Sequence, residues 1–104
     1  MFQIPTPAGH LKKNRFEFKL GDETASLPKL EFLPPEGDDY LDEVADRGMS
    51  NRTFILGFVD AVSPEVGAKL RALKLSRDQV NAFYEGWKNS SKVTPGESKA
   101  SVST

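Results

Sequence analysis

Apolar residues change their spacing along this chain, and the change separates a strand region from a helical region. Over residues 15–20 they alternate with charged residues, which places three on one face: Phe16, Phe18 and Leu20. Period-two alternation that includes aromatics indicates a half-buried strand. Gly21-Asp22 is a typical turn pair, and a weaker apolar run follows it. We predict a β-hairpin over residues 15–28 whose aromatic face packs on helices, because an isolated hairpin is marginal in water.

From residue 38 onward the apolar spacing becomes helical. We predict three to four short helices over residues 38–89, joined to the hairpin by an extended, proline-containing connector at 29–37. The most apolar helix begins near Ser50 and carries a stripe of Phe54, Ile55, Phe58, Val59 and Val62. The last helix opens with a capping box at Ser76-Arg77-Asp78-Gln79. Its apolar residues follow at helical spacing: Val80, Phe83, Tyr84 and Trp87.

The two ends of the chain have a different character. Residues 1–14 are predicted to be a flexible arm, because Pro5 and Pro7 disfavour regular structure and Gly9 adds freedom. Residues 90–104 are poor in apolar residues and are predicted to be a disordered tail. The predicted fold class is therefore mainly α (α+β): one globular domain over residues 15–89, with an N-terminal β-hairpin packed on a bundle of short helices.

Composition and charge remove several classes of function. The net charge is -1, from 14 basic and 15 acidic residues, which gives no support for nucleic-acid binding. The 104 residues contain no cysteine, so a disulfide framework and a thiolate site are ruled out. Neither a signal-peptide core nor a membrane-spanning run is apparent, and we expect the protein to stay in the cytoplasm where it is made, with no membrane partner.

The sequence offers little that resembles an active site. The single histidine, His10, falls in the predicted arm, and there is no glycine-rich phosphate loop or metal-spaced histidine pair. Six acidic residues follow the connector: Glu36, Asp38, Asp39, Asp42, Glu43 and Asp46. We interpret them as the first turn and the solvated face of a helix, with a cation site as the alternative. The sequence thus predicts no enzyme, no cofactor and no metal site.

Aromatic residues are the remaining candidates for function. The stripe of the last helix is interpreted first as core, but a domain this small seldom buries so many aromatics completely. Part of the stripe would then be an apolar surface for a partner helix. The candidate protein-binding residues are Phe54, Phe58, Phe83, Tyr84 and Trp87.

Several segments, taken in order, resemble a known family. They are Phe16-Glu17-Phe18 before a turn, Leu27-Pro28 and Leu33-Pro34, the leucine-rich run 70–76, Phe83-Tyr84-Glu85-Gly86-Trp87, and Gly96-Glu97-Ser98-Lys99-Ala100-Ser101. This order resembles the tail assembly chaperones of long-tailed (siphovirus-type) actinobacterial phages and prophages, over about residues 15–101. The chain departs from that pattern at Gly86, where alanine is common, in the linker 91–95, and in the arm, which has no clear counterpart.

The resemblance implies a protein of the host cytoplasm that binds the long, helical tape measure protein and keeps it soluble during tail tube assembly. It also implies tail tube protein and a longer, frameshifted form of the chain as further partners, and it is compatible with a homo-oligomer. Two alternatives stay open. One is a small virion structural or tail-completion protein, and the other is a DNA-binding regulator with the third and fourth helices as a helix-turn-helix.

Overall fold

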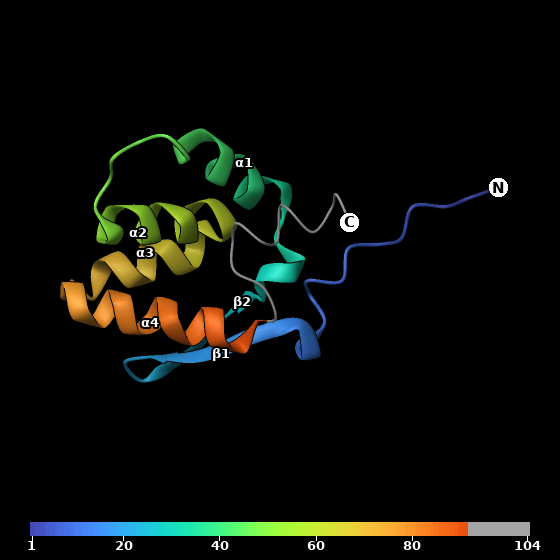
Figure 1. Ribbon diagram of the computed structural model, residues 1–104. Helices are drawn as coiled ribbons and strands as arrows, with labels where there is room; N and C mark the ends of the chain where they lie inside the picture. The colour runs from blue at the N-terminus through green and yellow to red at the C-terminus, as the bar shows by residue number, and fades with distance from the viewer. Residues whose placement is uncertain (92–104) are drawn as a thin grey trace.

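The computed structural model describes residues 1–91 and consists of a hairpin against four helices (Figure 1). In chain order the elements are the short 3₁₀ turn η1 (Lys12–Asn14), β1 (Arg15–Leu20), β2 (Glu23–Pro28), the 3₁₀ turn η2 (Leu30–Phe32), α1 (Pro35–Val44), α2 (Asn51–Val62), α3 (Pro64–Ala72) and α4 (Arg77–Ser90). The predicted fold class, a hairpin packed on a helical bundle, is confirmed. The tail predicted from residue 90 lies outside the described residues, apart from its first two.

The hairpin forms where the alternation predicts it. β1 and β2 are antiparallel, with Phe16 opposite Leu27 and Leu20 opposite Glu23 across the two-residue turn. Gly21 in that turn has a φ of 61°, a left-handed conformation that glycine adopts without steric cost. Pro28 ends β2 and lacks an amide donor, which suits the last position of a strand.

Serine caps begin three of the helices. The hydroxyls of Ser50, Ser63 and Ser76 accept from backbone amides in the first turns of α2, α3 and α4. At α4 the predicted capping box is present, because the Gln79 side chain also accepts from the Ser76 amide, at 2.8 Å. These local signals mark where α2, α3 and α4 start.

The first helix starts earlier than its predicted boundary at residue 38. α1 begins at Pro35, because Pro34 is extended at the N-cap and a proline at the first helical position has its φ already set. The predicted connector is thus shorter and contains η2, whose Leu30 is fully buried. Glu36 and Asp38 occupy the first turn of α1, where negative charge suits the helix dipole.

The core lies where α2, α4 and the hairpin meet. Its fully buried side chains include Leu27 from β2, Phe58 and Val59 from α2, and Trp87 from α4. The Phe58 and Trp87 rings stack with centroids 5.0 Å apart. Each such side chain contributes roughly 1.5–3 kcal/mol by burial, so this cluster supplies most of the driving force for packing the hairpin on the helices.

Two hydrogen bonds join the end of α4 to the end of the hairpin and to η2, and a third is local to the end of α4. Trp87 donates its indole N–H to the buried carbonyl of Pro28 at 2.9 Å. The amide of Leu30 donates to the Ser91 hydroxyl at 2.9 Å, and that hydroxyl donates to the Trp87 carbonyl at 3.0 Å. Ser90 and Ser91, which the sequence assigned to the tail, therefore belong to the fold.

The predicted arm divides into two parts. From Ala8 onward it is held to the hairpin: Asn14 donates to the Ala8 carbonyl, and the Arg15 guanidinium donates to the carbonyls of Gly9 and Ser26, each at 3.0 Å. Residues 1–7 are all exposed and extend away from the body of the molecule (Figure 1). The flexible-arm prediction for 1–14 is therefore wrong over 8–14, because the side chains of Asn14 and Arg15 hydrogen-bond the backbone carbonyls of Ala8 and Gly9.

Candidate functional site

Two of the five predicted protein-binding residues cannot contact a partner in this fold. Phe58 and Trp87 are both 0% exposed, at the centre of the core. The stripes of α2 and α4 face each other, so their most apolar positions pair within the chain. For Phe58 and Trp87 the prediction of a binding surface is therefore wrong, and their role is to hold the domain together.

Phe54 and Tyr84 are half-buried on another side of the same helix pair. Their rings meet edge-on at 6.1 Å and line a depression of about 380 Å³, together with Asn51, Asn81 and Lys88. The Lys88 ammonium lies 5.0 Å from the Tyr84 ring centroid. Burial, with a smaller contribution from Glu85, raises the pKa of the Tyr84 phenol to about 12. This polar-rimmed depression is a poor match for a purely apolar ligand.

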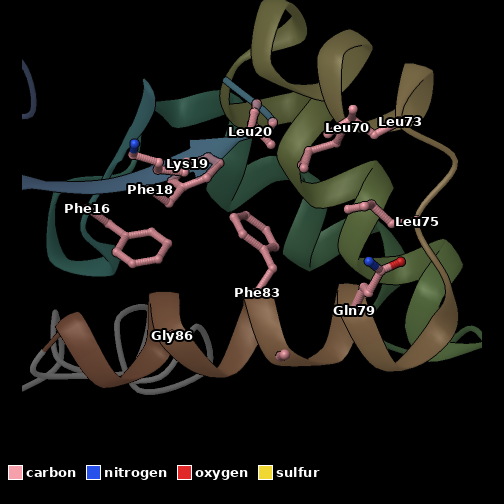
Figure 2. Close-up of a pocket in the computed structure, with 12 residues that line it drawn as sticks. Phe16, Phe18, Lys19, Leu20, Leu70, Leu73, Leu75, Gln79, Phe83 and Gly86 are labelled. Atoms are coloured by element: carbon pink, nitrogen blue, oxygen red, sulfur yellow. The ribbon is translucent and has the colours of Figure 1, made fainter. Parts of the chain in front are cut away.

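Phe83 opens onto a different and more apolar feature, which we call the hairpin groove. The groove has a volume of about 360 Å³ and runs between β1, α4 and the segment that joins α3 to α4. Figure 2 shows Phe16 and Phe18 directed from the hairpin toward Phe83, which rises from α4. Its lining residues are Phe16, Phe18, Lys19, Leu20, Gly21, Leu70, Leu73, Leu75, Gln79, Ala82, Phe83 and Gly86.

Three aromatic rings form one wall of the hairpin groove. Phe16 and Phe18 stack with centroids 5.2 Å apart, and Phe83 meets Phe18 edge-on at 5.0 Å and Phe16 at 6.1 Å. All three side chains are half-buried. Aromatic contacts of this kind contribute about 0.5–1.5 kcal/mol each beyond area burial. These contacts hold the three rings in place although the rings also border the open groove.

Leucines from the end of α3 form the opposite wall. Lys74 has a φ of 52°, a left-handed conformation that ends α3. Leu73 and Leu75, on either side of that residue, both line the groove, and Leu73 remains 44% exposed. Apolar side chains in an open hollow are a common feature of protein-binding surfaces.

Sequence reasoning found one of the groove residues and missed the rest. Phe83 was among the candidates, whereas Phe16 and Phe18 were predicted only to pack on helices. The run 70–76 holds three leucines around one left-handed residue. That density of leucine at a helix end was the available signal for an exposed apolar wall.

Histidine and acidic side chains are not grouped for metal binding in the part of the chain that the structure describes. Across residues 1–91 no three histidine or acidic side chains lie in a group that could hold a metal ion. His10 lines a separate cavity of about 480 Å³, together with Pro7, Phe32 and Pro34. No helix in that range is both long enough and apolar enough to span a bilayer.

Comparison with known proteins adds one partial similarity. Argininosuccinate lyase of Rhodococcus jostii (strain RHA1) is 34% identical over 68 residues, which is 65% of this chain but only 12% of the lyase. The chain thus spans about an eighth of that relative, and so short a match does not establish a shared activity. No protein-family profile matches the chain. No solved structure matches it significantly either.

Proposed function

We propose that this chain is a phage tail assembly chaperone that binds an apolar helical segment of a tape measure protein in the hairpin groove. The observation that carries the proposal is the open groove itself, with three half-buried phenylalanines on one wall and a 44% exposed Leu73 on the other. An amphipathic helix buries its apolar side in such a groove through residues at helical spacing. The resemblance in the order of sequence segments supports the identity of the client.

The composition of the surface is compatible with a holding role. Charged residues of both signs make up 28% of the chain, which gives the groove a hydrophilic surround. Binding of this kind needs an apolar contact area and a soluble remainder, with no reacting group. The proposal places the protein in the host cytoplasm, with tail tube protein and a longer, frameshifted form of the chain as further partners.

Co-expression with the tape measure protein of the same phage tests the proposal. The wild-type chain should move the client from the insoluble to the soluble fraction and co-purify with it. Leu73→Glu should abolish this effect, because it places a charge in the groove at an already exposed position. Leu11→Glu is the matched control, since Leu11 is 40% exposed and lies outside the groove. An insoluble client with the wild-type chain would overturn the proposal.

Two further measurements separate the alternatives. A virion structural or tail-completion protein would be found by mass spectrometry in purified particles, whereas a chaperone would be absent from them. A helix-turn-helix regulator would shift duplex DNA in a gel, with an affinity that falls steeply as salt rises. We expect neither result.

A further inference from the structure

The first residues of the chain carry apolar side chains that find no contact in the same molecule. Phe2 is 85% exposed and Ile4 is 83% exposed. In an extended segment these two side chains fall on one face, with Gln3 on the other. Residues 2–9 contain no charged side chain, although 28% of the whole chain is charged. Such a segment is suited to burial, not to solvation.

The first residues of the chain are held at Gly9 and extend away from the rest of the molecule. Gly9 packs closely against Phe32, since a Cβ atom at Gly9 would lie 2.9 Å from the Phe32 carbonyl oxygen, and Arg15 binds the Gly9 carbonyl. From that anchor residues 1–7 extend outward, away from the helices (Figure 1). Phe2 and Ile4 therefore reach an apolar surface on a second molecule more easily than one on the same molecule.

The hairpin groove has the chemistry that these two side chains need. Its lining is mostly apolar, with Lys19 and Gln79 as the polar members, and its volume of about 360 Å³ lies in the range of about 300–1,000 Å³ found for small-molecule sites. Figure 2 shows Phe83 on one side of the groove and Leu73 and Leu75 on the other. An extended segment can place Phe2 and Ile4 in it without burying a charged side chain, because residues 2–9 have none.

We propose that residues 1–5 of one copy dock in the hairpin groove of a second copy, with Phe2 and Ile4 between Phe83 and Leu73. The chain self-associates through this exchange, and it does so in the absence of any client. If the exchange is reciprocal, it closes a dimer; if it is head-to-tail, it continues into longer assemblies. The arm and a client helix then compete for the same groove.

Sedimentation of the full chain over a range of concentrations tests the exchange. The wild type should associate reversibly, and the double variant Phe2→Asp with Ile4→Asp should dissociate at least roughly ten-fold more readily. Gln3→Asp adds a charge to the same segment on its other face and should associate more strongly than the double variant. The variants change only exposed residues, so folding is preserved and circular dichroism serves as the check.

Cysteine pairing shows whether the contact is between two molecules. Because the chain has no cysteine of its own, Phe2→Cys on a size-tagged copy can be mixed with Leu73→Cys on an untagged copy. Mild oxidation should give a mixed disulfide faster than with Ala45→Cys, an exposed position on the α1 side. A strictly monomeric wild type, or equal rates at Leu73 and Ala45, would overturn the proposal.

These outcomes are independent of the proposed chaperone function. Self-association is measured with no client present, so a negative result leaves client binding in the groove untouched. Conversely, an insoluble tape measure protein would not bear on the exchange between copies.

Discussion

One aromatic stripe on α4 is used in opposite ways at its two ends. At one end Trp87 is sealed beneath Phe58 and donates its indole N–H to Pro28, with no exposed surface. One turn earlier on the same face, Phe83 meets Phe16 and Phe18 and stays half-buried at the edge of the hairpin groove.

The difference arises from what covers each end of the stripe. α2 packs over Trp87, where Leu56, Phe58 and Val59 are buried in the same cluster. At Phe83 the two-stranded hairpin covers the ring and leaves the groove toward Leu73 open. An aromatic residue on this helix is thus core where a second helix packs over it and surface where only the hairpin does, and the predictions below probe that distinction.

Truncation of the fully buried Trp87 should have the largest effect on the free energy of unfolding. Trp87→Ala removes a fully buried side chain and leaves the buried Pro28 carbonyl without its donor, so we expect a loss of about 3–5 kcal/mol in the free energy of unfolding. Domains of this kind are stable by only about 5–15 kcal/mol. Urea unfolding followed by circular dichroism measures the change.

Phe83→Ala is the matched truncation at the hairpin groove, for comparison with Trp87→Ala. Its ring is partly exposed before the change, so the loss of stability should be clearly smaller than that of Trp87→Ala. Equal losses of stability in the two variants would mean that Phe83 is as much part of the core as Trp87.

A charge in the open groove should affect binding and not folding. Leu73→Glu should weaken client binding by at least about ten-fold, or about 1.4 kcal/mol. Its effect on the free energy of unfolding should stay within roughly 0.5 kcal/mol, as for other exposed positions. Titration calorimetry with a soluble client fragment, alongside urea unfolding, gives both numbers. A large loss of stability would show that Leu73 packs more tightly than its exposure indicates.

Replacing Gly86 by alanine should stabilise the fold, whereas most substitutions destabilise it. Gly86→Ala adds a methyl group that would lie 3.4 Å from Phe16 Cζ, an ordinary contact, within the helix α4. Removing glycine from a helix interior should then stabilise the fold by about 0.5–1 kcal/mol, while narrowing the groove. Thermal unfolding measures the gain.

Gly57→Ala provides the opposite control for Gly86→Ala. A side chain at Gly57 would collide with the Tyr40 hydroxyl, which donates to the Phe54 carbonyl at 2.9 Å. This variant should therefore lose stability. A gain at both positions would contradict the packing of Tyr40 on α2.

At neutral pH the smallest effect is expected from the Tyr84 phenol, because its ionisation changes stability only in alkaline solution. Burial raises the pKa of Tyr84 to about 12 from its ordinary value of 10.0, so above pH 10.0 the folded chain retains a proton that the unfolded chain releases. Stability is thus fully present below that value and falls as the pH rises toward about 12. Tyr84→Phe should make unfolding less sensitive to pH in this window.

A part of the alkaline loss should persist in Tyr84→Phe. Burial also raises the pKa of Tyr40, with a smaller contribution from Asp60. Urea unfolding at several pH values separates the two phenols. An unchanged pH profile in Tyr84→Phe would place the Tyr84 hydroxyl in solvent.

Local chemistry determined much of this fold without tertiary information. The alternation over residues 15–20 and the Gly21-Asp22 turn specified the hairpin, and Ser63-Pro64 and the Ser76–Gln79 capping box specified the starts of α3 and α4. Each signal acts over a few neighbouring residues, so the sequence alone contains it. The start of α1 is the exception, because Pro34-Pro35 is compatible with both an extended connector and a helix start.

Only the tertiary structure decided which aromatics are sealed and which are open. Periodicity placed Phe83 and Trp87 on one stripe, but Trp87 is buried through contacts with Pro28 and Phe58, which lie 59 and 29 positions earlier in the chain. Likewise, residues 8–14 are held because Arg15 in β1 reaches back to the Gly9 carbonyl. Burial depends on which distant elements arrive to cover a side chain, and no local pattern of residues encodes that outcome.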